Sequence, residues 1–225
     1  FDIRVTDSNG ASTVTELSVV VTGTQTAPEI TSNAVQAQGS VTEDVTLTTG
    51  GTLGYDDPDA ATPTSGVWSV LPTATALGSI EINAATGVWL YTLDETAADS
   101  LNAGEIRTES FTATITDADG LSDTQDITVT VTGSNDAPSL SAQTTALLED
   151  DVAVTVDLRA NAADPDSGDT AASLSFAVVS GPAAGIASVT GGTLRFDPDG
   201  AFDDLATGET RAIFVGIEVR DAQGA

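Results

Sequence analysis

Apolar and polar residues alternate along much of the chain, which is the pattern of β-strands with one buried face. In residues 111–116 each apolar residue is followed by threonine, and residues 127–132 repeat this alternation after the turn sequence DADG. Two alternating runs joined by Asp and Gly are typical of a β-hairpin. We therefore predict a hairpin with one buried face over residues 111–132.

This hairpin belongs to a repeat. Residues 1–28 return at residues 111–138, and a third copy begins at Val215, so that Asp7, Asp117 and Asp221 occupy equivalent positions. The first copy has the same alternation, with Phe1, Ile3 and Val5 followed by Leu17, Val19 and Val21. A period of about 105 to 110 residues is the size of one sandwich-type module, so the chain is a tandem array.

Further strand-like runs lie between the hairpins, near residues 45–49, 67–71, 79–82 and 88–93, and residues 95–101 form the one plausible helical turn. Clusters of Gly, Pro, Asp and Asn separate the runs, as expected for loops. About seven short strands per period predict an all-β protein of immunoglobulin-type Greek-key β-sandwiches joined end to end.

Short linkers mark the module boundaries. At residues 22–28 and 132–138 a strand ends at Gly, and a Pro follows that blocks its continuation. We predict the C-terminal hairpin of a preceding repeat over residues 1–23, a complete repeat over residues 24–134, and a repeat without its final strand over residues 135–225. The chain is then a window from a longer polypeptide.

Composition narrows the range of partners. The 225 residues carry a formal net charge of −28, and arginine supplies all six basic side chains. Such a field repels nucleic acid and anionic lipid and attracts cations. No run approaches the roughly 18 apolar residues of a membrane span, so we expect no membrane insertion by this segment.

The inventory for catalysis is poor, because His, Cys and Lys are absent and no G-x-S-x-G sequence occurs. A carboxylate pair for glycoside hydrolysis would need a cleft, whereas the acidic residues here cluster in turns. We predict that the segment is not an enzyme. Trp68, Trp89 and Tyr91 could form a sugar-stacking platform, but their place in strand-like runs favours packing in the core.

Acidic side chains recur at the loops that meet the linkers. Calcium takes six to eight oxygen ligands, mostly carboxylates and carbonyls, and Asp-x-Asp turns supply them. In an immunoglobulin-type module the loops at residues 56–59 and 117–120 share one end with the incoming linker, and Glu43, Asp44 and Glu105 lie at the other end. The predicted calcium ligands at the first junction are Asp57, Asp59, Asp117 and Asp119. Those at the second junction are Glu43, Asp44, Glu105, Asn135, Asp136, Asp164, Asp166 and Asp221.

The simpler interpretation of each acidic turn is conformational, because Asp and Asn with Gly are common turn residues. Their recurrence at ends that meet favours calcium, since so many carboxylates in one gap repel one another without a cation. We expect the junctions to splay without metal and to lock with it.

Several short sequences, namely TGSNDAP, the TED and LEDD openings, DPD, LxxGE and TDADG, resemble the VCBS and cadherin-like repeats of large RTX-type bacterial surface adhesins. The resemblance covers essentially the whole chain. It implies calcium-rigidified extenders of secreted proteins that act in cell adhesion and biofilms at the bacterial surface. The first linker departs from the pattern, with Gln25 and Thr26 where the second has Asn135 and Asp136, which predicts weaker calcium binding there.

We therefore expect a non-enzymatic, calcium-stiffened extender that projects a distal binding region, with the neighbouring repeats of the same polypeptide as its partners. The alternative is a self-assembling extracellular fibre or surface layer, in which strands of other copies of the chain complete open sheet edges. Direct binding of a glycan or a receptor has no sequence feature in its favour beyond exposed loops.

Overall fold

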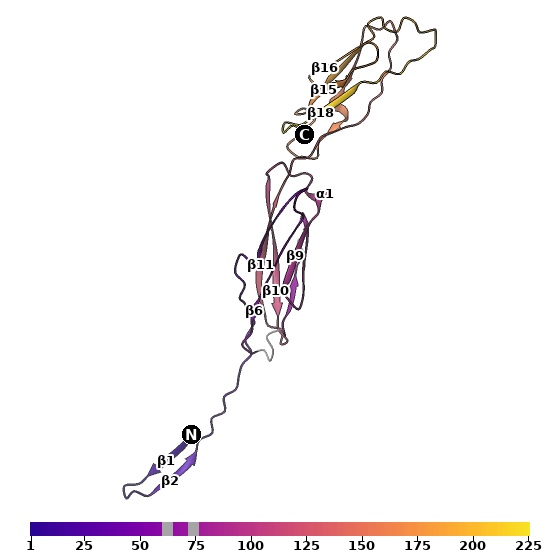
Figure 1. Cartoon of the computed structure of the whole chain (residues 1–225). Coiled ribbons are helices and arrows are strands. Elements are labelled where there is room, and N and C mark those ends of the chain that lie inside the picture. Colours follow the sequence, from indigo (N-terminus) through magenta and orange to yellow (C-terminus); the bar gives the residue numbers. More distant parts are fainter. Residues whose placement is uncertain (60–64, 72–76) are drawn as a thin grey trace.

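A computed structural model describes residues 1–59, 65–71 and 77–225. The chain is all-β and elongated, with an N-terminal hairpin, a middle module and a C-terminal module following one another along one line (Figure 1). We call the linker at residues 22–28 the first junction and the linker at residues 132–138 the second junction. No helix of the described residues is long and apolar enough to cross a membrane.

The N-terminal hairpin consists of β1 (Asp2–Thr6) and β2 (Ser12–Glu16), which pair antiparallel. Its apolar side chains are exposed, and Phe1 is 90% exposed. The predicted continuation of the second strand through Leu17, Val19 and Val21 is wrong, because β2 ends at Glu16. The hairpin packs on no second sheet in the described structure, and the burial that rewards a longer strand is therefore missing.

The middle module is a sandwich of two sheets, in which β4 runs parallel to β11 and the other pairs are antiparallel. One sheet has the order β4 (Gln38–Thr42), β11 (Ser122–Thr132), β10 (Ile106–Thr116) and β7 (Val67–Val70). The other has the order β5 (Thr48–Thr52), β9 (Val88–Leu93) and β8 (Gly78–Ile82). A short pair, β3 (Glu29–Ile30) and β6 (Tyr55–Asp56), lies beside them.

The alternating residues form the core between these sheets. Ile127, Val129 and Val131 are fully buried on one strand, while the intervening threonines face outward. Trp89 and Tyr91 are also buried, and the Trp89 indole Nε1 donates to the Gln36 carbonyl at 2.9 Å. The prediction that the aromatic residues pack in the core is confirmed, Trp68 included.

The strand predicted near residues 45–49 is displaced. Residues 43–46 form a turn closed by hydrogen bonds between Thr42 and Thr46, with Asp44 at φ +59°, and the strand β5 begins only at Thr48. Glu43 therefore lies in the turn that follows β4, where it contacts the linker residue Ser134. The predicted helical turn is present as α1 (Glu95–Ala98).

The C-terminal module repeats this plan. Its sheets are β13–β17–β16, β15–β18 and the short pair β12–β14. The elements are β12 (Ser139–Leu140), β13 (Val154–Asp157), η1 (Leu158–Asn161), β14 (Ala162–Ala163), β15 (Ser175–Ser180), β16 (Ile186–Thr190), β17 (Thr193–Asp197) and β18 (Gly216–Arg220). Its buried apolar residues include Leu158, Leu174, Phe196 and Phe202. The chain is thus an all-β protein with two tandem β-sandwich modules, as predicted.

Candidate metal centre

One hairpin turn occurs three times and presents an aspartate in the same way each time. The Oδ1 atoms of Asp7, Asp117 and Asp221 accept hydrogen bonds from backbone N–H groups two to four residues later. A glycine at positive φ closes each turn. The turn occupies one carboxylate oxygen, and in Asp221 the other accepts from the linker residue Asn135 at 2.7 Å.

The Asp-Pro-Asp loops hold the linkers. In each loop the first aspartate accepts from the backbone N–H of the second, at 3.1 Å for Asp57 and 3.0 Å for Asp164. The second aspartate then accepts from the linker backbone: Thr26 donates to Asp59, and Asp136 donates to Asp166 at 3.0 Å. Both linkers therefore dock through the same backbone contact.

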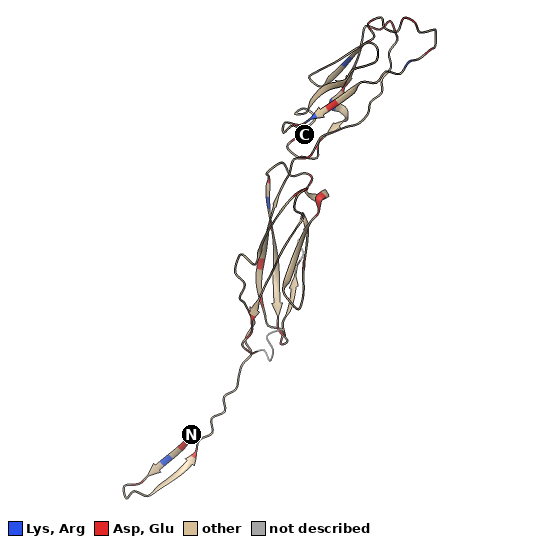
Figure 2. Ribbon diagram, in the orientation of Figure 1, with Lys and Arg blue, Asp and Glu red and all other residues tan. Residues whose placement is uncertain are grey.

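At the second junction the carboxylates gather into two groups, within each of which the candidate ligand atoms lie within 4.8 Å of one another. Glu43, Asp99 and Asp136 form the first group, and Asp164, Asp166 and Asp169 form the second. Acidic segments outnumber basic ones along the ribbon (Figure 2). Of the ion pairs within the described ranges, none reaches either group.

Elements of both modules position these groups. Glu43 is 1% exposed, and its Oε2 accepts from the Ser134 backbone N–H at 3.0 Å, while the Ser134 hydroxyl donates to the Glu43 carbonyl at 2.7 Å. Asp99 caps the C-terminal end of α1. Asp136 follows in the linker, so the first group joins the middle module to the linker, and the second group belongs to one loop of the C-terminal module.

At the second junction, five buried side-chain oxygens have no hydrogen-bond partner among the described residues. Each is a carboxylate or amide oxygen and so acts as an acceptor. They are Glu43 Oε1, Asn135 Oδ1, Asp136 Oδ2, Asp164 Oδ2 and Asp166 Oδ1. Leaving one buried acceptor unpaired costs about 1 to 3 kcal/mol, and more for a charged group. Donors or a cation must therefore complete this constellation.

Three of these carboxyl groups have raised pKa values. Burial is the main cause for Glu43, Asp136 and Asp164, and neighbouring carboxylates add to it. Asp136 senses carboxylates of both groups, since Asp166 and Asp99 each contribute to its raised pKa. The pKa of Asp221 is lowered instead, chiefly by the Asn135 amide, which donates to it at 2.7 Å.

Three of the predicted carboxylate ligands, Asp44, Glu105 and Asp221, lie outside both groups. Asp44 is exposed, although its charge contributes to the raised pKa values of Glu43 and Asp136. Glu105 accepts from the Asn102 side chain at 2.6 Å and pairs with Arg107 at 2.7 Å. These bonds lower the pKa of Glu105 and engage its carboxylate outside the gap.

The first junction has a different character. Asp57, Asp59, Asp117 and Asp119 line a cavity of about 240 Å³ together with the linker residues Gln25 and Thr26. The prediction that these two loops share one end with the linker is confirmed. The Gln25 side-chain amide donates to Asp119 and the Thr26 backbone donates to Asp59, so linker donors reach two of the four carboxylates. In the described structure these four form no group comparable to those of the second junction.

Sequence reasoning missed Asp99 and Asp169. Asp99 lay in the predicted helical turn, and Asp203 occupies the equivalent place in the C-terminal module. Alignment of the repeats could have found Asp99 but not Asp169, because Thr62 stands at the equivalent position of the middle module.

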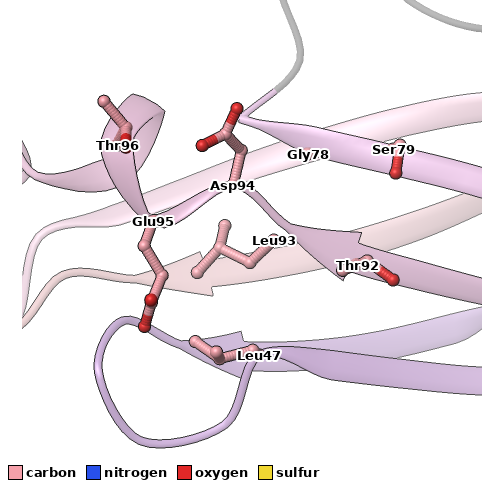
Figure 3. Close-up of a pocket in the computed structure, with 8 residues that line it drawn as sticks. All are labelled: Leu47, Gly78, Ser79, Thr92, Leu93, Asp94, Glu95 and Thr96. Carbon is pink, nitrogen blue, oxygen red and sulfur yellow. The ribbon is translucent and has the colours of Figure 1, made fainter.

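A second depression lies away from the linkers, at the end of β8 and β9 beside α1 (Figure 3). Its lining is mixed, with Leu47 and Leu93 beside Asp94 and Glu95. Neither of these carboxylates belongs to a metal-ligating group of the described residues. We assign this depression no ligand.

The donor set of the second junction suits a hard divalent cation. Every candidate ligand is a carboxylate or amide oxygen, and loops and turns of two modules supply them. Calcium accepts many oxygen ligands in flexible geometry, whereas magnesium demands a near-ideal octahedron, and softer metals prefer nitrogen or sulfur. The residues at this junction therefore fit calcium best.

Among solved structures, the chain is similar to cadherin ectodomains. The human desmocollin-1 ectodomain matches at 17% identity with a TM-score of 0.43, over 97% of this chain and 38% of that one. Human protocadherin-24 EC1-2 matches at 14% identity with a TM-score of 0.48, over 87% of each chain. Drosophila N-cadherin EC1-4 matches at 14% identity with a TM-score of 0.46, over 87% of this chain and 48% of that one.

No curated protein matches the chain. A family model does so twice, over residues 25–130 and 135–225, and its description is bacterial Ig domain. The two matches follow one another and together take in most of the sequence. They correspond to the two sandwiches described above, so the chain belongs to the bacterial Ig domain family, of which it holds two tandem members.

Proposed function

We propose that this chain is a non-enzymatic extender segment of a secreted or surface-attached bacterial adhesin, and that calcium stiffens it at the second junction. The supporting observation is the set of five buried oxygens without partners, contributed by the middle module, the linker and the C-terminal module. A cation that binds them joins two rigid bodies. Its binding energy then opposes bending at the linker.

Electrostatics give the size of this effect. Two carboxylates about 4 Å apart repel by roughly 1 to 4 kcal/mol, depending on their exposure. Each group at the second junction holds three carboxylates, and Asp136 senses both groups. The repulsion of Asp136 by Asp164 and Asp166 acts between the linker and the C-terminal module, so without a cation it favours their separation, and a bound cation offsets it.

The shape of the chain supports a mechanical role. The modules follow one another along one line (Figure 1). Each adds roughly 35 to 45 Å, because the 11-residue strands β10 and β11 span about 36 Å at about 3.3 Å per residue and loops extend them. Membership of the bacterial Ig domain family supports a location at the bacterial surface or outside the cell. The resemblance to VCBS and cadherin-like repeats of RTX-type adhesins supports the finer assignment.

Small-angle scattering of the 225-residue chain tests the proposal, in calcium, in magnesium and in chelator. We expect a narrower cross-section and a larger maximum dimension in calcium than in chelator, together with a higher melting temperature. Magnesium serves as the control for simple charge screening. A maximum dimension and a melting temperature that calcium leaves unchanged would show that the chain is not a calcium-stiffened rod.

A further inference from the structure

Asn102 lies in the loop between α1 and β10 and contacts both modules. Its Nδ2 donates to Glu105 Oε2 at 2.6 Å and to the Ser167 hydroxyl at 3.2 Å, and its Oδ1 accepts from the Gly168 backbone N–H. Beside it, the Ser167 backbone N–H donates to the Ser100 carbonyl at 3.2 Å. Three hydrogen bonds therefore cross from the middle module to one loop of the C-terminal module.

Two glycines give this loop its close fit. A Cβ atom on Gly168 would lie 2.4 Å from Asn102 Oδ1, and a Cβ on Gly133 would lie 2.5 Å from the Asn102 carbonyl oxygen. Backbone hydrogen bonds join Gly133 to Gly104 and to Glu105. Asn102 thus lies between the start of the linker and the next module: a Cβ on Gly133 would meet backbone, and a Cβ on Gly168 would force the Asn102 amide to move and give up its contact.

These crossing contacts differ in kind from the carboxylate groups. Amide, hydroxyl and backbone groups make them, so they are complete without a cation and independent of the charge in the gap. They also bear on the metal-ligating loop directly, because Ser167 and Gly168 lie between Asp166 and Asp169. Holding these two residues holds the loop that carries the second carboxylate group.

We infer that Asn102 is a positioning residue: it keeps the C-terminal module in register on the middle module before any cation binds, with the two carboxylate groups facing each other. Because the gap that it aligns is the proposed calcium site, the role of Asn102 in metal affinity rests on the proposed function. Its role in the register of the metal-free chain does not.

The aligned repeats differ at both positions of this contact. Ala206 aligns with Asn102 in the C-terminal module, and Ala61 aligns with Gly168 in the middle module.

Distance measurements between two spin labels test this role. The chain has no Cys, so Thr124→Cys in the middle module and Ser188→Cys in the C-terminal module, both exposed, give specific labelling. Asn102→Ala removes the crossing side chain, and Asn102→Asp keeps its shape but replaces the donor facing Glu105 with an oxygen. Ala103→Asn, at an exposed neighbour, is the matched control.

In chelator we expect a broader distance distribution for Asn102→Ala and for Asn102→Asp than for the wild type and the control. In calcium all four should be narrow, with calcium affinity for Asn102→Ala lower by about three- to tenfold, as the loss of one or two hydrogen bonds implies. Asn102→Asp should lose affinity to a similar degree, because it lacks the donor to Ser167 and places a second carboxylate beside Glu105.

An Asn102→Ala distribution as narrow as the wild type in chelator overturns the inference. A middle module that melts at an unchanged temperature shows that the variant is folded and that broadening comes from the junction. If calcium alters neither width nor melting in the wild type while Asn102→Ala still broadens the distribution in chelator, the positioning role stands and the calcium proposal fails.

Discussion

The two junctions dock their linkers in the same way but differ in what surrounds the docked strand. In both, a linker backbone N–H donates to the second aspartate of an Asp-Pro-Asp loop. Among the described residues, only the second junction gathers carboxylates into close groups around that frame. The differing positions are Asp136 against Thr26, Asp169 against Thr62 and Gly168 against Ala61. Linker docking and cation binding are therefore separable properties, since a backbone N–H group docks the linker, whereas side-chain carboxylates would bind the cation.

The difference extends to how the acidic oxygens are satisfied. At the first junction the Gln25 amide reaches Asp119, so a protein donor takes the place that a cation could occupy. At the second junction Asn135, one methylene shorter, reaches Asp221 and leaves its own Oδ1 buried without a partner. The linker side chain thus satisfies an acidic oxygen at the first junction, whereas buried acceptors stay unpaired at the second.

The largest expected effect comes from Asp166→Asn. This change keeps the shape of a side chain that is 1% exposed, but removes a charge from the second group. We expect calcium affinity to fall by about 100-fold or more, because a buried carboxylate ligand is lost. Titration calorimetry measures it, and Asp59→Asn at the first junction is the matched control, with a change below about threefold. Equal effects of the two variants would mean that the junctions do not differ.

A smaller effect is expected from Asp136→Thr, which gives the second linker the residue of the first. The backbone contact to Asp166 should survive, since the N–H makes it. Calcium affinity should fall by about tenfold, because one shared carboxylate is removed while the loop keeps its place. Calorimetry again gives the affinity, and an unchanged value would show that Asp136 is not a ligand. The reverse change, Thr26→Asp, should add weak binding at the first junction.

The pH response has a sign that the raised pKa values fix. Glu43, Asp136 and Asp164 have raised pKa values in the docked structure, so docking takes up protons when the modules close without calcium. In chelator the closed junction is therefore favoured at low pH and opens as pH rises through those raised pKa values. In calcium we expect the opposite pH dependence, with the closed junction favoured at higher pH, because protons compete with calcium for the carboxylate ligands. Distances between spin labels across the junction should narrow on acidification only in chelator, and narrowing in both conditions would contradict this account.

The smallest effect should come from Gln25→Asn, which gives the first linker the amide of the second. The shorter side chain no longer reaches Asp119 but can approach Asp117, as Asn135 approaches Asp221. One exposed hydrogen bond is exchanged for another, so unfolding free energy should change by less than about 1 kcal/mol. Denaturant titration tests this, and a loss well above that value would show that Gln25 is a structural anchor.

Much of the fold could be predicted because it depends on local patterns. Strands β10 and β11 alternate over their whole length, and the repeat confirmed where the loops lie. The displaced β5 could not be predicted in this way. Its turn depends on Asp44 at positive φ and on hydrogen bonds of Ser134 with Glu43, ninety-one residues apart in sequence.

The candidate site was predicted in outline, since the repeats place acids at the ends that meet. Which acidic residues belong to the site depends on whether a neighbouring side chain binds their carboxylates instead, and sequence spacing does not reveal this. Glu105 is drawn away by Asn102 and Arg107, whereas Asp99 turns toward Glu43 from the end of a short helix. Only the side-chain positions in the structure show which carboxylates bind a residue outside the site.

The contact between Asn102 and Gly168 gives a rule that can be applied to other sequences. The contact needs two residues that lie sixty-six positions apart. They are an asparagine at the end of one module and a glycine after the Asp-Pro-Asp sequence of the next. Any larger residue at the glycine position collides with the amide, so the two positions should change as a pair. The residues at these two positions in an array of such modules would then indicate which junctions hold neighbouring modules in a fixed orientation and which allow them to rotate.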